Sequence, residues 1–177
     1  MGRALKNAQP SGLSDKELLS MARNLGAVGP RIIPPQTVET GCWVRLKCQF
    51  GCSGYGMCLT CPPHSPTPER TRQTLDEYRR AIFFELGKGV SRRIAVELER
   101  QLFLQGYYKA FAMAAGPCDL CDECGLEEGC RHRGEARPAL EACGIDVYAT
   151  ARRHGFTIEV VRGHKDPQHY FAMVLLD

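Results

Sequence analysis

Eight of the ten cysteines in this 177-residue chain lie in two short segments, and these segments constrain the fold more than any other feature. The first group has the spacing C-x3-C-x5-C-x2-C and consists of Cys48, Cys52, Cys58 and Cys61. The second has the spacing C-x2-C-x2-C-x5-C and consists of Cys118, Cys121, Cys124 and Cys130. Four sulfurs so close in sequence indicate two disulfides, a zinc ion or an iron-sulfur cluster.

The rest of the chain favours metal over disulfides. Cysteine makes up about 6% of the residues, below the roughly 8–10% of short secreted disulfide scaffolds. The N-terminal sequence MGRALKNAQPSGLSDKE contains no apolar core of a signal peptide, and no apolar run approaches the ~18 residues of a membrane span. We therefore expect a cytoplasmic protein without a membrane span, in which grouped cysteines bind metal.

The second group is typical of an iron-sulfur cluster. Zinc usually takes one C-x2-C pair from each of two separated turns, whereas three cysteines at intervals of three residues wrap around something larger than one ion. Its first three positions match the bacterial ferredoxin run, but the fourth cysteine follows after five residues and precedes Arg131 instead of proline. Cys130 can therefore complete its own cluster, which we favour, or reach a second one. A zinc knuckle is the alternative.

The first group also forms a complete set of four ligands. Glycines at 51, 54 and 56 permit the backbone angles that a wrapping loop needs, and Pro62 and Pro63 follow the last cysteine. Its spacing is less specific than that of the second group. Two such groups in one chain nevertheless favour two [4Fe-4S] clusters, with zinc as the alternative cofactor.

Two cysteines remain outside the groups. Cys143 lies on the apolar stripe of an expected helix, and Cys42 precedes Trp43 in an expected strand. Buried cysteine behaves as a small hydrophobic residue, so we expect both in the core, with a role as substitute ligand as the alternative.

The remaining sequence predicts an α+β fold, with a mixed β-sheet, helices packed on it and two cysteine-rich cluster-binding loops. Hydrophobic periodicity and capping residues predict helices at 15–25, 67–79, 91–105 and from 138 to about 154. Strands are expected at 42–47, 81–86 and 107–115, followed by a hairpin of 157–161 with 170–176. The strand, helix and strand between 81 and 115 predict a parallel crossover. We expect residues 1–13 to form a flexible arm and 14–177 a single metal-binding domain, with cysteine-rich segments 42–63 and 116–133.

The formal net charge of +3 does not indicate a nucleic-acid partner. Eight thiolates around two clusters of core charge about 2+ each would bring the net charge to about −1. The chain also has no block of Lys and Arg with interleaved aromatics, so we expect no binding to nucleic acid.

The cysteine-rich segments also resemble a known family. The stretches WVRLKCQFGCSGYGMCLTCPPHSPTPE, GPCDLCDECGLEEGCRH and ARPALEACGIDVYATARRHGF are similar to an uncharacterised cysteine-rich family of predicted metal-binding proteins, a domain of unknown function found largely in anaerobes. The resemblance runs from about Val38 to the C-terminus. It implies binding of metal, as iron-sulfur, by the eight grouped cysteines, and it implies no reaction.

We therefore expect an iron-sulfur protein that transfers electrons to or from an unidentified redox partner. Two fully cysteine-ligated clusters leave no open iron for substrate, and the sequence offers no clear acid-base residues. One alternative is an iron-sulfur enzyme in which one cluster has an open iron site for substrate or sulfur. The other is a zinc-knuckle interaction protein.

Overall fold

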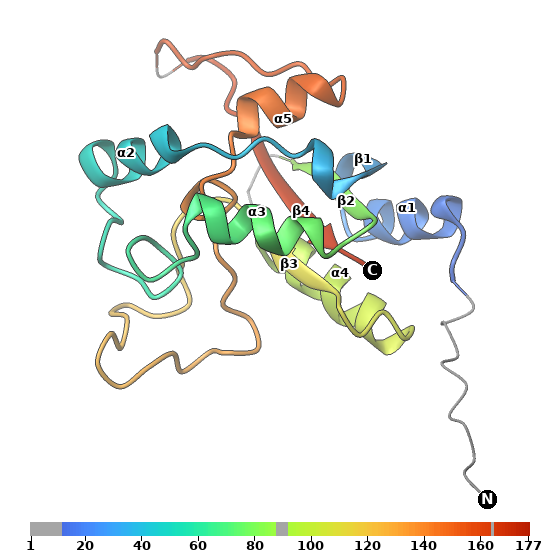
Figure 1. The fold of residues 1–177 in the computed structure, drawn as a ribbon, viewed down its shortest axis with the longest axis horizontal. Coiled ribbons are helices and arrows are strands. Elements are labelled where there is room, and N and C mark those ends of the chain that lie inside the picture. Colours follow the sequence, from blue (N-terminus) through green and yellow to red (C-terminus); the bar gives the residue numbers. More distant parts are fainter. Residues whose placement is uncertain (1–11, 88–91, 164) are drawn as a thin grey trace, which may run out of the picture.

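The computed structural model describes residues 12–87, 92–163 and 165–177, which form an α+β fold as predicted (Figure 1). The helices are α1 (Asp15–Asn24), α2 (Cys42–Gly51), α3 (Pro68–Asp76), α4 (Arg92–Leu104) and α5 (Val147–Arg153), with short 3-10 helices η1 (Pro35–Thr37) and η2 (Glu141–Cys143). The strands are β1 (Ala27–Ile33), β2 (Ala81–Leu86), β3 (Phe111–Met113) and β4 (Tyr170–Leu175). None of the described helices is long and apolar enough to cross a membrane. Most of the predicted arm lies outside the described residues.

The four strands form one sheet in the order β1-β2-β4-β3, and each neighbouring pair is antiparallel. The expected parallel pairing of 81–86 with 107–115 is therefore wrong, as is the mixed sheet that it implied. Strands β2 and β3 do run in the same direction, but β4 lies between them and pairs with both. The connection through α4 skips one strand position, and the C-terminal strand fills it.

Both faces of the sheet are buried, which explains the continuous apolar sequences of β2 and β4. Successive side chains of a strand point to opposite faces. Phe84 and Val174 face a core that is covered by α1 and α4, whereas Phe83 and Met173 face a second core formed with α3 and α5. The sheet thus lies between two layers of helices (Figure 1).

Capping residues set the starts of two helices as predicted. In α1, Ser14 Oγ accepts from the backbone N–H of Glu17 at 3.4 Å, and the Glu17 carboxylate accepts from the backbone N–H of Ser14 at 2.8 Å. In α3, Thr67 Oγ1 accepts from the backbone N–H of Arg70 at 3.2 Å. The predicted start of α4 at Ser91 lies outside the described residues, and α3 ends at Asp76 rather than at 79.

Segment 42–47 is part of α2, so the expected strand there is wrong. Gly41 is extended and precedes the first helical turn, and the alternation of polar and apolar residues that follows does not mark two sheet faces. Val44 is the buried residue of this helix, while Trp43, Leu46 and Phe50 are exposed. Leu, Arg, Lys and Gln residues of α2 also have good helix propensities.

The helix expected from Pro138 to about 154 is divided into η2 and α5. Gly144 adopts a left-handed conformation with φ of 78°, and a Cβ atom there would lie 2.4 Å from Cγ of Pro68. The chain turns at this glycine because α3 passes so close. Asp146 then caps α5 by accepting from the backbone N–H of Ala149 at 2.9 Å. Gly155 follows the end of α5, as predicted.

The expected hairpin between 157–161 and 170–176 is wrong, because only the second segment forms a strand. Ile158 is buried in the core with α5, and its carbonyl accepts a hydrogen bond from Arg152 at 2.9 Å. The backbone of this segment is thus held by a helix side chain. Strand β4 pairs with β2 and β3 instead.

Candidate metal centre

The first cysteine loop leaves the end of α2 and is fastened to the core where it returns. Arg45 of α2 donates to the carbonyls of Pro66 and Ala142, both at 2.8 Å. Ser65 Oγ also donates to Ala142, at 2.6 Å. Because Ser65 and Arg45 share this acceptor in η2, the ends of the loop are fixed relative to each other and to the second core.

The second cysteine loop starts and ends at one point of the fold. The backbone N–H of Ala114 donates to Pro138 and the N–H of Leu140 donates to Ala114, each at 2.9 Å. Residues 115–138 therefore form a closed excursion from the end of β3, within which all four cysteines of the second group lie.

A buried arginine of α4 supports the base of the second loop. Arg92 is 7% exposed, donates to the carbonyl of Pro117 and forms an ion pair with Asp119 at 2.9 Å. Its Nη1 atom is buried without a hydrogen-bond partner among the described residues. This guanidinium stands beside the loop segment that carries Cys118, where positive charge would offset that of metal-bound thiolates.

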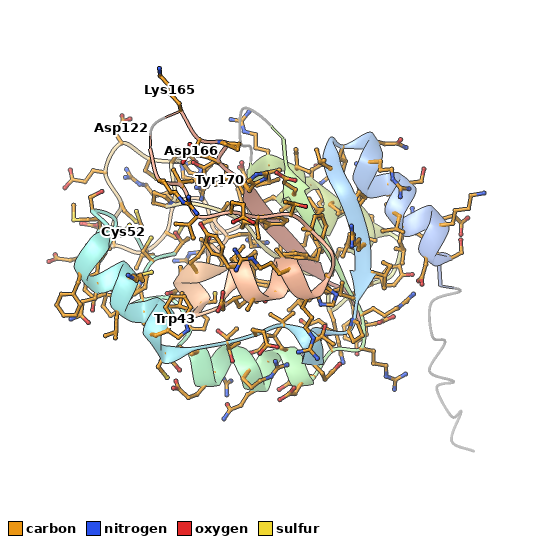
Figure 2. All side chains as sticks on the ribbon, turned by 90° about the horizontal axis from the view of Figure 1, so that it is seen from above. Trp43, Cys52, Asp122, Lys165, Asp166 and Tyr170 are labelled. Carbon is orange, nitrogen blue, oxygen red and sulfur yellow. The ribbon has the colours of Figure 1, made fainter. Side chains whose placement is uncertain are left out.

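The two cysteine groups meet, although 60 residues separate Cys58 from Cys118. Cys58 Sγ lies 3.8 Å from the carbonyl oxygen of Cys118, and the backbone N–H of Leu59 donates to Cys124 Sγ at 3.5 Å. Figure 2 shows Cys52 of the first loop and Asp122 of the second on the same side of the molecule. The loops therefore form one cysteine-rich region.

Two cavities border the grouped sulfurs, and the thiol of Cys58 lies close to sulfurs of both groups. A cavity of about 360 Å³ is lined by Cys48, Cys52 and Cys61. A Cβ atom at Gly54 would lie 3.6 Å from Cys52 Sγ and 3.8 Å from Cys61 Sγ, so both sulfurs border this glycine. A second cavity of about 220 Å³ is lined by Cys58, Cys118, Cys121, Cys124 and Cys130.

Backbone N–H groups point at sulfur atoms in both loops. Gly54 donates to Cys52 Sγ at 3.4 Å, and His132 donates to Cys130 Sγ at 3.4 Å. With the bond from Leu59 to Cys124, three of the eight grouped sulfurs accept such bonds from N–H groups of the described residues. Hydrogen bonds of this kind stabilise thiolates and tune iron-sulfur clusters.

Without metal, the surroundings of three grouped cysteines disfavour thiolates. Burial, and next the neighbouring sulfur of Cys58, raise the pKa of Cys61 to about 11. Burial is also the main reason why the pKa values of Cys48 and Cys58 lie above the ordinary range of a thiol. A bound cation would reverse this effect, because it stabilises the charged form and releases the proton.

The donor set suits an iron-sulfur group chemically, since it combines thiols, N–H···S bonds and a buried guanidinium. When bound, such a group supplies one-electron transfer. Among residues 12–87, 92–163 and 165–177, no three His, Cys, Asp or Glu side chains are arranged to hold one metal ion.

The two remaining cysteines have different environments. Cys143 is fully buried in the second core, as expected, and burial raises its pKa to about 12. Cys42 is exposed, so its expected place in the core is wrong. Its thiol donates to the Glu69 carboxylate at 3.1 Å, because α2 begins at this residue and turns its side chain toward α3.

Sequence reasoning did not find Arg92 or the cavity beside the first group. Arg92 is one of many arginines and precedes Pro117 by 25 residues, so no local signal marked it. The cavity combines residues of α2 and α5 with Tyr170 of β4, which only the fold brings together.

Comparison with known proteins identifies the family. The model of a family described as predicted metal-binding protein, domain of unknown function 2284, matches residues 31–176. No curated protein and no solved structure gave a significant match to the chain. The matched region contains all eight grouped cysteines and both loops that hold them, and the chain therefore belongs to this family of predicted metal-binding proteins.

Proposed function

We propose that this chain binds two [4Fe-4S] clusters in its cysteine-rich region and transfers electrons to or from a redox partner protein. The ligands are drawn from the eight grouped cysteines. The observation that carries the proposal is the contact between the two groups, in which Cys58 Sγ lies 3.8 Å from the Cys118 carbonyl oxygen. Electron transfer falls steeply with distance, so adjoining centres favour passage of an electron between them.

The position of the sulfurs at the surface supports exchange with another protein. Cys52 is exposed, and six of the other grouped cysteines are partly exposed. Clusters held there would lie close to a docked partner. A cytoplasmic location, where such loops stay reduced, is part of this proposal.

Purification under strict anaerobic conditions tests the metal. We expect a brown protein that contains iron and acid-labile sulfide. Cys121→Ser should remove about half of the iron, because the second centre loses one of its sulfurs. The exposed Cys42 is the control, and Cys42→Ser should retain all the iron.

The zinc-knuckle alternative would be favoured by a colourless protein that contains zinc. Full retention of iron by Cys121→Ser would refute the assignment of a cluster to the second group.

A further inference from the structure

A third cavity lies where both cysteine loops return to the fold. It measures about 510 Å³, within the range of about 300–1,000 Å³ for ligand pockets. Helix α3 and strand β3, which lie close together in Figure 1, line it together with the returning segments of the two loops. Cys130 is the one grouped cysteine among the described lining residues. The fold itself, rather than the grouped sulfurs, therefore bounds most of this space.

One wall of the cavity is apolar. Phe111 and Met113 are two positions apart in β3, so their side chains lie on the same face of that strand. Leu59 of the first loop and Pro138 at the end of the second extend this wall. The surface suits the body of an aromatic molecule, because an aromatic ring buries a large apolar area.

The opposite wall carries hydroxyl groups that can accept hydrogen bonds. Thr71, Thr74 and Tyr78 recur at helical spacing along α3 and just after it, and all three line the cavity. The Thr71 hydroxyl donates to the Cys143 carbonyl at 2.7 Å, and the other two donate to backbone carbonyls at 2.9 Å. A hydroxyl has one hydrogen and two lone pairs, so these oxygens can only accept from a ligand. Because Thr71 is 1% exposed, the buried end of the cavity favours a ligand with a hydrogen-bond donor.

The exposed lining residues provide positive charge and hydrogen-bond donors. His64 and Arg133 line the cavity from the two loops, and both are exposed. Arg133 Nε donates to the Cys130 carbonyl at 3.2 Å, but its guanidinium forms no ion pair with any residue that the structure describes. No Asp or Glu is among the described lining residues. The open end of the cavity therefore favours a carboxylate, which a guanidinium binds with two parallel hydrogen bonds.

We propose that this cavity binds a small organic acid that has an aromatic body and a hydroxyl group. The carboxylate binds Arg133 and His64 at the open end, and the ring packs on Phe111 and Met113. The hydroxyl of the ligand donates to the α3 hydroxyl oxygens at the buried end. Binding is non-covalent and involves no metal, so this inference goes beyond the proposed electron transfer and does not rest on it.

Isothermal titration calorimetry of the anaerobically purified full chain tests the ligand class. The probe 4-hydroxyphenylacetate combines the three features, and we expect it to bind with a Kd below about 1 mM. Phenylacetate lacks the hydroxyl and should bind about fivefold more weakly, since one hydrogen bond is lost. The alcohol 2-(4-hydroxyphenyl)ethanol lacks the carboxylate and should bind about tenfold more weakly than the acid.

Three variants test the location. Arg133→Gln should weaken binding of 4-hydroxyphenylacetate about tenfold and leave the affinity for the alcohol unchanged. Arg70→Gln is the matched control, because Arg70 is an exposed arginine on α3 that does not line the cavity. Ala136→Leu adds a larger side chain to the lining and should weaken binding of both compounds, with its far-UV circular dichroism unchanged.

The outcomes separate this inference from the proposed function. Iron-containing protein that binds none of the three compounds, or binds all three equally, would overturn the inference and leave the proposed function standing. An equal loss of affinity for the acid and the alcohol in Arg133→Gln would overturn it too, because a change in loop structure alone would have that effect. Protein without iron that binds the acid with the expected selectivity would refute the proposed function and support this site.

Discussion

A largely buried ion pair between α4 and the end of the second cysteine loop should contribute strongly to stability. Arg137 binds Glu99 through two hydrogen bonds, of 2.7 and 2.5 Å, and the two side chains are 12% and 13% exposed. The same carboxylate accepts from the backbone N–H of Ala112 in β3 at 2.7 Å. One side chain thus joins a helix, an edge strand and the loop.

Replacing this glutamate by alanine would leave Nε and Nη2 of Arg137 and the N–H of Ala112 without an acceptor, whereas Nη1 of Arg137 would keep the carbonyls of Arg133 and Ala136. Removal of one partner of a buried pair costs about 3–5 kcal/mol, and an orphaned buried N–H costs about 1–3 kcal/mol. These losses overlap, and slight exposure reduces both, so we expect Glu99→Ala to lower the free energy of unfolding by about 3–4 kcal/mol. The melting temperature of a domain of this size should fall by about 10 °C.

Urea denaturation followed by far-UV circular dichroism, under argon with reductant, measures this effect. Glu99→Gln keeps an acceptor for Ala112 and should cost about half as much. Glu97→Ala is the control on the same helix, because its ion pair with Arg100 is exposed and 3.7 Å long, and it should cost no more than about 0.5 kcal/mol. Equal losses for Glu99→Ala and Glu97→Ala would refute the reasoning.

Three further predictions concern the frame around the site. Gly144→Ala should destabilise the fold by about 2–3 kcal/mol in the same urea assay, because φ is positive and the new Cβ would meet Pro68. Burial and two neighbouring arginines lower the pKa of His154, so the stability it contributes is complete above pH of about 6.5 and declines as the pH falls toward its folded-state pKa. His154→Gln should make stability less dependent on pH in that acidic range. Arg92→Ala should release iron from the second centre, measured by elemental analysis, whereas Asp119→Asn should retain it because Asp119 is mostly exposed.

Each of these three predictions has a control variant or a result that would contradict it. Gly134→Ala should be nearly neutral, because Gly134 has no positive φ and no atom would lie within 4 Å of its Cβ. If Gly134→Ala and Gly144→Ala lowered the free energy of unfolding equally, the close approach of Gly144 to α3 would be contradicted. An unchanged pH profile in His154→Gln would show that another group titrates there. Full iron content in Arg92→Ala would show that its charge does not support the second loop.

Capping residues and apolar runs in the sequence predicted those helices and strands whose formation depends on neighbouring residues. The sequence predicted the reciprocal cap of Ser14 and Glu17 and the cap at Thr67, because each cap involves residues three positions apart. The apolar run of residues 81–86 predicted strand β2, because both faces of that strand are buried. The sequence did not predict the strand order, since the insertion of β4 between β2 and β3 depends on packing of the whole chain.

The same distinction holds at the site. Spacing identified the eight grouped cysteines as candidate ligands, and the family match supports metal binding. The spacing did not show that Cys58 lies against the second group, because this contact depends on how the two loops meet in space. Nor did it show Arg92, which reaches the second loop from a helix that precedes it.

Quantification of iron, sulfide and zinc in the anaerobically purified chain tests the central claim most directly. Two [4Fe-4S] clusters predict about eight iron atoms and about eight sulfide ions per chain, with no stoichiometric zinc. A colourless protein with zinc and no iron would contradict the account.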